Sequence, residues 1–269
     1  MKKQRTYLLL SVLFLLFLIT AGWYFQFFSD TTEIDFNKRF IPPGLSHLGG
    51  TDELGRDILQ RTLQGASLSL WLAIVAWVVS LVVGMAVGAV SGYYSGSFID
   101  LIISSLITYA YATPFIIFLI ALLGLTGPGL VNAYLILVLF AWAPPARHTR
   151  AVVTGLKETS YLKAAQSYGF SSKQLIYFVI MPRVFKPVVI ASLAVLPEII
   201  ALDAVISFFG LGVQPPVPSL GKMIVDGINY LSSAWWMTLF PVAVLFLICL
   251  VIRNIVNIIG LRGVKYEQV

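Results

Sequence analysis

Charged residues are scarce in this sequence. Only 11% of its 269 residues are Asp, Glu, Lys or Arg, and 58% are hydrophobic, whereas a typical soluble domain carries about 25% charged residues. This composition excludes a soluble globular domain. The high apolar content excludes a disordered chain, and the 21 glycines follow no three-residue period, which excludes a collagen-like fibre. What remains is a protein that crosses a membrane several times.

Residues that carry catalysis or bind metals are equally scarce. The one cysteine, Cys249, lies in an apolar run, so no intrachain disulfide can form. His47 and His148 belong to no group of Cys, His, Asp and Glu with the spacing of a metal site. Neither a phosphate-binding loop nor a nucleophile elbow occurs. We expect no catalytic residue, no bound metal and no cofactor on this chain.

Long uncharged runs predict six membrane-spanning helices, because about 20 apolar residues cross the hydrocarbon core. We expect Pro114 to kink one span and the glycine-rich stretch at 124–129 to separate two others. Pro187 suits the first turn of the fifth span. The predicted spans are about Leu8–Phe28, Leu68–Gly92, two within Leu101–Ala146, Pro187–Gly210 and Trp235–Ile259.

The basic residues predict the orientation in the cell membrane. Lys and Arg in short loops stay on the cytoplasmic side, and here they precede the first span, separate the fourth from the fifth and follow the last. Both termini are therefore expected to be cytoplasmic. Because the net charge of +6 is explained in this way, we expect a lipid bilayer and no nucleic acid as partner. The residues concerned are Lys2, Lys3, Arg5, Arg147, Arg150, Lys157, Lys163, Lys173, Arg183, Lys186, Arg253, Arg262 and Lys265.

Small residues recur every four positions along the second span, which places them on one helical face. Such a face lets two membrane helices approach closely, since lipid offers no hydrophobic drive for pairing. Packing within this chain is the favoured interpretation, and contact with a second membrane subunit is the other. The residues are Ala76, Ser80, Gly84, Gly88 and Gly92.

The basic segment between the fourth and fifth spans is too long for a turn and too short to form its own core. Its first half predicts a short helix over Ser160–Tyr168, and Gly169 suits a left-handed C-terminal cap. A second helix begins at Ser171, which forms a capping box with Gln174, and Pro182 is expected to end it. Phe170 and Leu175 are spaced as a hydrophobic staple.

This segment resembles the cytoplasmic loop of membrane subunits of ATP-binding-cassette (ABC) importers, which reads Glu-Ala-Ala, three residues, Gly, nine residues, Ile-x-Leu-Pro. The chain has Lys163-Ala164-Ala165, then Gly169, then Val179-Ile180-Met181-Pro182, with each spacing kept. In that family the loop forms coupling helices that insert into a groove on the ATPase subunit. The resemblance implies ATPase coupling through residues 156–182, carried by Lys163, Ala164, Ala165, Gly169 and Pro182.

Lys163 departs from the family pattern, which has a glutamate at this position. If Ser160 is the N-cap, the glutamate would complete a capping box, whereas lysine cannot accept that hydrogen bond. The substitution then costs about 0.5–1 kcal/mol, partly offset by Glu158. Our hypothesis is that Lys163 meets an acidic residue of the ATPase.

Two further motifs narrow the resemblance to permeases of the dipeptide, oligopeptide and nickel class. The first runs from His47 to Asp57 and differs from the class only at Leu48 and Gly49; the second runs from Ser207 to Pro216. The resemblance implies an all-α membrane protein with the architecture of a type I ABC importer permease. It also implies a homologous but distinct second permease, two ATPase subunits that carry ATP and Mg²⁺, and an extracytoplasmic substrate-binding protein.

The resemblance also suggests how the chain divides and what it carries. We expect an anchor helix (1–28), an extracytoplasmic segment (29–66), a permease core of five spans (67–262) that includes the loop 147–186, and a cytoplasmic tail (263–269).

The cargo is expected to be small peptides or nickel and other metal chelates, and short loops slightly favour the metal branch. A secondary transporter without ATPase subunits is the alternative, although no repeated half with broken helices is visible. A membrane-anchored enzyme is disfavoured because no catalytic set is present.

Two acids lie inside the fifth span, where an ionisable group is costly unless it is paired or faces water. Glu198 lies near mid-membrane and Asp203 nearer the outer face, about 18 Å and about 26 Å from Lys186 at 1.5 Å per residue. They are candidates for the translocation pathway, and a structural hydrogen bond is the competing interpretation. On the outer side, Ser29–Ala66 and the loop at Gln214 are either braces for the bundle or parts of a docking surface for the binding protein.

Overall fold

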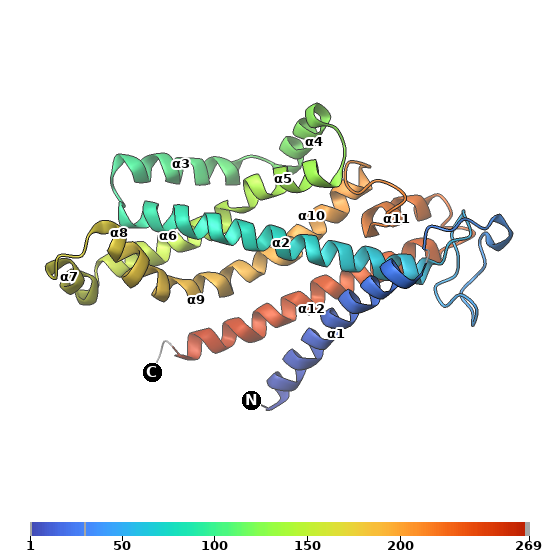
Figure 1. The fold of residues 1–269 in the computed structure, drawn as a ribbon, viewed down its shortest axis with the longest axis horizontal. Helices are drawn as coiled ribbons and strands as arrows, with labels where there is room; N and C mark the ends of the chain where they lie inside the picture. The colour runs from blue at the N-terminus through green and yellow to red at the C-terminus, as the bar shows by residue number, and fades with distance from the viewer. Residues whose placement is uncertain (1, 30, 267–269) are drawn as a thin grey trace. The chain divides into compact units, whose positions relative to one another are not determined.

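The computed structural model describes residues 2–29 and 31–266, and the regular elements among them are helices. Met1, Asp30 and residues 267–269 of the predicted tail lie outside the described residues. The helices are α1 (Lys2–Phe28), η1 (Phe36–Lys38), α2 (Ile58–Tyr93), α3 (Phe98–Ala112), α4 (Phe115–Thr126), α5 (Leu130–Ala141), α6 (Ala143–Lys157), α7 (Ser160–Ser167), α8 (Ser172–Gln174), η2 (Leu175–Ile180), α9 (Met181–Ser192), η3 (Leu193–Val195), α10 (Leu196–Phe208), α11 (Leu220–Ile228) and α12 (Trp236–Tyr266) (Figure 1).

The chain packs as two compact units. Unit 1 contains Met1–Ile74, Leu122–Tyr134 and Leu196–Ile258. Unit 2 contains Val75–Ala121, Leu135–Val195 and Ile259–Val269. The long helix α2 supplies residues to both units, so each unit is built from segments that are distant in sequence.

Five helical stretches are long and apolar enough to cross a membrane, and the pair α3 and α4 forms a sixth candidate with a bend of 90°. The predicted helical membrane fold with about six spans is thus confirmed. Pro114 stands at the bend, where the expected kink is a complete break, because proline has no N–H and restricts the residue before it. The five stretches are Arg5–Phe28, Ile58–Tyr93, Leu130–Lys157, Ser172–Phe208 and Trp236–Gly260.

The fifth predicted span begins earlier than the sequence indicates. Helical structure runs from Ser172 to Phe208, and Pro187 lies inside α9 rather than in a first turn. Pro187 cannot donate to the carbonyl of Arg183. The neighbouring side chains Val184 and Val188 are fully buried in the core of unit 2, and this packing keeps the helix continuous through the proline.

In unit 1, an apolar cluster joins the segment before α2 to α11 and α12. Ile58, Met223, Trp236 and Met237 are buried together, and Trp236 Nε1 donates a hydrogen bond to the Thr51 carbonyl at 3.0 Å. The end of α1 and the beginnings of α2 and α12 therefore lie at the same end of this unit (Figure 1). Which side of the membrane this end faces stays a prediction.

In unit 2, the ridge of small residues on α2 packs against α6 of the same chain. A Cβ added at Gly84 would lie 2.6 Å from the Trp142 carbonyl oxygen, and one at Gly92 would meet α6 at 2.7 Å. A Cβ at Gly88 would overlap the Ala146 carbonyl oxygen. Only glycine allows so close an approach of two helices. For these glycines, the favoured interpretation of packing within the chain is confirmed.

We expect Gly88→Ala to lower the thermal stability of the solubilised protein, although alanine favours a helix by about 1 kcal/mol over glycine. Gly155→Ala on α6 is the matched control, because no atom lies within 4 Å of a Cβ there, and it should be neutral or stabilising. Thermal unfolding followed by tryptophan fluorescence measures both. A Gly88→Ala protein as stable as the control would show that α2 and α6 are not in close contact.

Candidate functional site

The segment that resembles a coupling loop contains two short helices, α7 and α8, as predicted. The N-cap of α7 is Thr159 and not Ser160, and its hydroxyl donates to the Leu156 carbonyl at 2.7 Å instead of capping the helix. Lys163 is therefore the fourth helical residue and not the third. The predicted capping cost of Lys163 is wrong for this reason, because a side chain in that position takes no part in a capping box.

The turn between the two helices is built as predicted. Gly169 has φ +80° and donates its N–H to the Gln166 carbonyl at 3.0 Å, which is the left-handed conformation that glycine adopts without strain. Ser171 and Gln174 form the capping box, with Ser171 N donating to Gln174 Oε1 at 2.9 Å. These bonds fix the direction in which the second helix leaves the turn.

Pro182 does not end the second helix, which corrects the prediction. The segment η2 before it is π-helical, and Pro182 lies in the first turn of α9. Proline has no N–H to donate back into η2, yet the helical path continues through Pro182. Helical structure therefore passes from α8 through η2 into α9.

The loop has one buried and one exposed face. Leu162 and Leu175 are buried in the core of unit 2, and Ala165 packs against the same core. Lys163 and Ala164 are exposed. Four aromatic side chains of the loop are between 51% and 85% exposed, namely Tyr161, Tyr168, Tyr177 and Phe178. A group of exposed aromatic side chains is typical of a protein interface.

Polar contacts hold the base of the loop. Arg150 on α6 makes a two-pronged ion pair with Asp100 on α3, at 2.7 and 2.9 Å. Ser91 Oγ donates to the same carboxylate at 2.6 Å. Beyond it, Lys157 at the end of α6 donates to Ser95 Oγ at 3.0 Å. The loop therefore leaves α6 from an end that is fixed to α2 and α3 within unit 2.

The two acids predicted for the pathway have different surroundings and lie five positions apart on α10. Asp203 is buried and accepts a hydrogen bond from Ser69 Oγ at 2.6 Å. Glu198 is exposed on this chain and has no hydrogen bond or ion pair with any described residue. It follows the 3₁₀ turn η3 (Leu193–Val195). The structure therefore does not bring the two carboxylates together, since five positions place side chains on different helical faces.

The motif His47–Asp57 forms a tight loop and not part of a helix. Asp52 accepts hydrogen bonds from the N–H groups of Leu54 and Arg56, both at 2.9 Å. His47 Nδ1 lies 2.9 Å from Asp57 Oδ2. The helix α2 begins only at Ile58, because Asp52 binds the preceding N–H groups into a turn.

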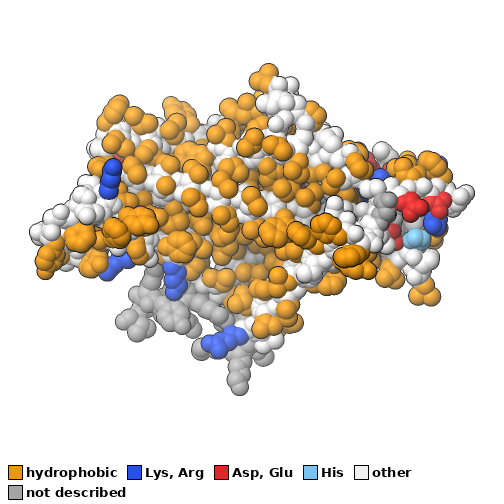
Figure 2. Space-filling view, viewed as in Figure 1, with side chains coloured by type: hydrophobic (Ala, Val, Ile, Leu, Met, Phe, Trp, Pro, Cys, Tyr) orange, Lys and Arg blue, Asp and Glu red, His pale blue; other side chains and the backbone are white. Residues whose placement is uncertain are grey.

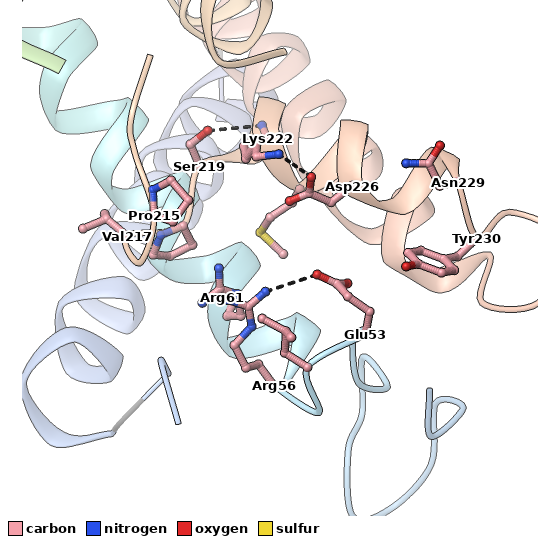
Figure 3. A pocket seen from close by; sticks show the side chains of 13 residues that line it. Glu53, Arg56, Arg61, Pro215, Val217, Ser219, Lys222, Asp226, Asn229 and Tyr230 are labelled. Carbon is pink, nitrogen blue, oxygen red and sulfur yellow. Dashed lines mark hydrogen bonds and ion pairs between the residues drawn. The ribbon is translucent and has the colours of Figure 1, made fainter. Parts of the chain in front are cut away.

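A cleft of about 340 Å³ opens between this loop, the start of α2 and α11, and we call it the α11 cleft. Figure 3 shows an ion pair on each of two facing walls, Arg56 with Glu53 at 3.5 Å and Lys222 with Asp226 at 2.5 Å. The lining residues are Glu53, Leu54, Arg56, Arg61, Pro215, Val217, Pro218, Ser219, Lys222, Met223, Asp226, Asn229 and Tyr230.

The helix α11 and its part in this cleft were not predicted from the sequence. Ser219 caps the helix by accepting from the Lys222 N–H at 3.2 Å, and Lys222 and Asp226 stand four positions apart as a helical ion pair. Both signals are visible in the sequence. The proximity of Lys222 and Asp226 to Glu53 is not visible in the sequence, because it depends on contacts between segments more than 160 residues apart.

The chain is similar to curated permeases over most of its length. A putative peptide transport system permease of Brucella suis biovar 1 is 33% identical over 97% of this chain and 86% of its own. The dipeptide transport system permease DppC of Bacillus subtilis is 31% identical over 89% of this chain and 75% of its own. The oligopeptide transport system permease OppC of Escherichia coli K12 is 35% identical over 87% of this chain and 77% of its own.

A solved structure has the same fold. It is that of the MetNI methionine ABC transporter in inward-facing conformations, with a TM-score of 0.58 at 21% identity, covering 75% of this chain and 97% of that chain. The family model described as "Binding-protein-dependent transport system inner membrane component" matches residues 84–262. The chain therefore belongs to this family, the multi-pass inner-membrane permease components of ABC transporters.

Proposed function

We propose that this chain is one of two homologous but distinct permease subunits of an ATP-driven importer for small peptides. The observation that carries the proposal is the helix pair α7 and α8, whose buried face packs on unit 2 and whose exposed face is apolar and basic. Two ATPase subunits would cover that face on the cytoplasmic side, and ATP and Mg²⁺ belong to them. Peptides are preferred over metal chelates as cargo because the similar permeases are named for peptide, dipeptide and oligopeptide transport.

The coupling proposed here is mechanical. Closure of the ATPases around ATP would move the turn at Gly169, and the continuous helix from Ser172 to Phe208 would transmit the movement into the membrane. An extracytoplasmic binding protein delivers the peptide to the other side. In this scheme the segments keep the predicted roles of anchor (1–28), extracytoplasmic segment (29–66), core (67–262) and cytoplasmic tail (263–269). Ala164 and Pro182 are exposed on the coupling surface, and Ala165 supports it by packing α7 against the core of unit 2.

Reconstitution into proteoliposomes tests the function. The chain, the second permease and the ATPase subunits are expected to take up a small peptide only when ATP and the binding protein are both supplied. Membranes that contain this chain alone, with an imposed proton or sodium gradient, are the control. Gradient-driven uptake by the chain alone would overturn the proposal in favour of a secondary transporter.

Lys163 is proposed to contact an acidic side chain of the ATPase. We expect Lys163→Glu to weaken co-purification of the ATPase by about tenfold, because it replaces an attraction by a repulsion at an interface. Lys163→Arg keeps the charge and serves as the control. The amount of ATPase retained on a tagged permease measures the effect, and unchanged or stronger retention with Lys163→Glu would contradict the proposed contact.

Glu198 and Asp203 are proposed to line the translocation pathway, with Glu198 as the residue that meets the cargo or its water. Glu198→Gln is expected to slow ATP-dependent peptide uptake at least fivefold while leaving the assembled complex intact, since the side chain has no bond within the described chain to lose. Asp203→Asn loses part of its bond to Ser69 and is expected to lower thermal stability as well as uptake. If both variants transport at the wild-type rate, neither acid belongs to the pathway.

A further inference from the structure

Helix α7 touches α9 through a contact that the coupling scheme above does not use. The Arg183 guanidinium on α9 lies over the Tyr161 ring on α7, with 3.7 Å between its Cζ and the ring centroid. A cation is attracted to an aromatic face within about 6 Å of the ring centroid, so this pair is well inside that range. Both residues belong to unit 2, and the contact therefore needs no partner subunit to form.

Helix α7 has few other attachments. Leu162 is buried in the core of unit 2, and Ala165 packs against the same core. Among the described residues, no side chain of α7 makes a hydrogen bond or an ion pair with another element. The chain leaves α7 through Gly169, whose φ is +80°, and glycine restrains the backbone least of all residues. Without the contact to Arg183, α7 is free to tilt about Leu162 and the turn at Gly169.

The π-helical segment η2 sets the direction in which Arg183 projects from α9. A π-turn takes one residue more than an α-turn, and one extra residue rotates all following side chains by about 100° around the helix axis. Arg183 lies three residues beyond the end of η2 at Ile180. Because η2 also contacts α7, the rotation that it introduces determines which side chain of α9 reaches Tyr161.

Arg183 has no competing partner among the described residues. Its side chain is exposed and makes no ion pair with any of them. Stacking uses only the flat face of the guanidinium, so its N–H groups stay hydrated at the edge. In Figure 2, hydrophobic side chains cover the end of unit 2 that carries α7, and basic side chains lie beside them. Both residues lie outside the motif at 163–182 that carries the resemblance, which therefore assigns them no role.

We propose that Arg183 and Tyr161 form a positioning pair that makes α7 and α9 move together. Arg183 acts through Tyr161 and touches neither cargo nor nucleotide. With the pair in place, a movement of α7 reaches α9 without being lost at Gly169. Without it, α7 tilts while α9 stays behind, and ATP is hydrolysed without import. The inference rests on the proposed function, because it names the residues that carry the coupling.

The test measures peptide imported per ATP hydrolysed by the complete transporter in proteoliposomes, with the peptide that the wild-type complex imports as cargo. Arg183→Gln is expected to lower this ratio at least threefold, because the uncharged amide is not attracted to the ring. Tyr161→Leu removes the ring and should lower the ratio to the same extent, whereas Tyr161→Phe keeps the ring and should restore it. The double variant is expected to be no worse than either single variant, since both remove one shared contact.

Lys173→Gln is the matched control, because Lys173 is an exposed cation of the same loop without an ion pair or ring contact to a described residue. It should keep the wild-type ratio. The amount of co-purified ATPase separates positioning from docking, and Arg183→Gln is expected to retain it within twofold. If Arg183→Gln does not reach the membrane, the comparison of Tyr161→Leu with Tyr161→Phe carries the test.

A wild-type ratio of import to hydrolysis in Arg183→Gln and Tyr161→Leu would overturn the inference. So would an Arg183→Gln protein that reaches the membrane but loses the ATPase, because Arg183 would then bind the ATPase instead of positioning α7. A wild-type complex that imports no peptide would instead overturn the proposed function.

Discussion

The close contact between α2 and α6 is the interaction on which the rest of unit 2 depends. Lipid tails are as apolar as the side chains, so helices in a bilayer gain little from the hydrophobic effect and must gain from contact area. Gly84, Gly88 and Gly92 bring the α6 backbone against α2, and the ion pair from Arg150 to Asp100 locks the end of α6. The loop that follows α6 therefore begins from a fixed point.

From that fixed point, the loop returns to the core of unit 2 within a few residues. α7 rests on the core of unit 2 through Leu162, and the turn at Gly169 directs the chain into α8. The π-helical η2 and the first turn of α9 carry the chain past Pro182 without a break. In the proposed coupling, a displacement of the turn would be passed along the helical segment Ser172–Phe208.

Local signals in the sequence predict local structure well in this chain. The capping box at Ser171 and the left-handed Gly169 form as expected, because both depend on residues within a few positions. The expectations for Pro182 and Pro187 were wrong, since burial of neighbours such as Val184 keeps the helix intact around each proline. The N-cap of α7 is Thr159, one residue before the predicted Ser160, so Lys163 lies outside the capping-box position.

The α11 cleft could not be found from sequence patterns, because its walls come from residues near 53 and near 222 that meet only in the folded unit 1. The separate environments of Asp203 and Glu198 are likewise tertiary, since the partner of Asp203 is Ser69 on another helix. The motifs His47–Asp57 and Ser207–Pro216 were both recognised in the sequence, but their convergence on one cleft depends on the packing of α11 against α10 and on the apolar cluster around Trp236.

The most direct test of the central claim is hydrogen exchange of the loop amides with and without the ATPase subunits. We predict that amides between Ser160 and Gln174 become strongly protected when the ATPases are added to the permease pair in nanodiscs, while amides of the loop His47–Asp57 do not change. Unchanged exchange in Ser160–Gln174 in a complex that binds the ATPases would contradict the claim that this helix pair is the coupling surface.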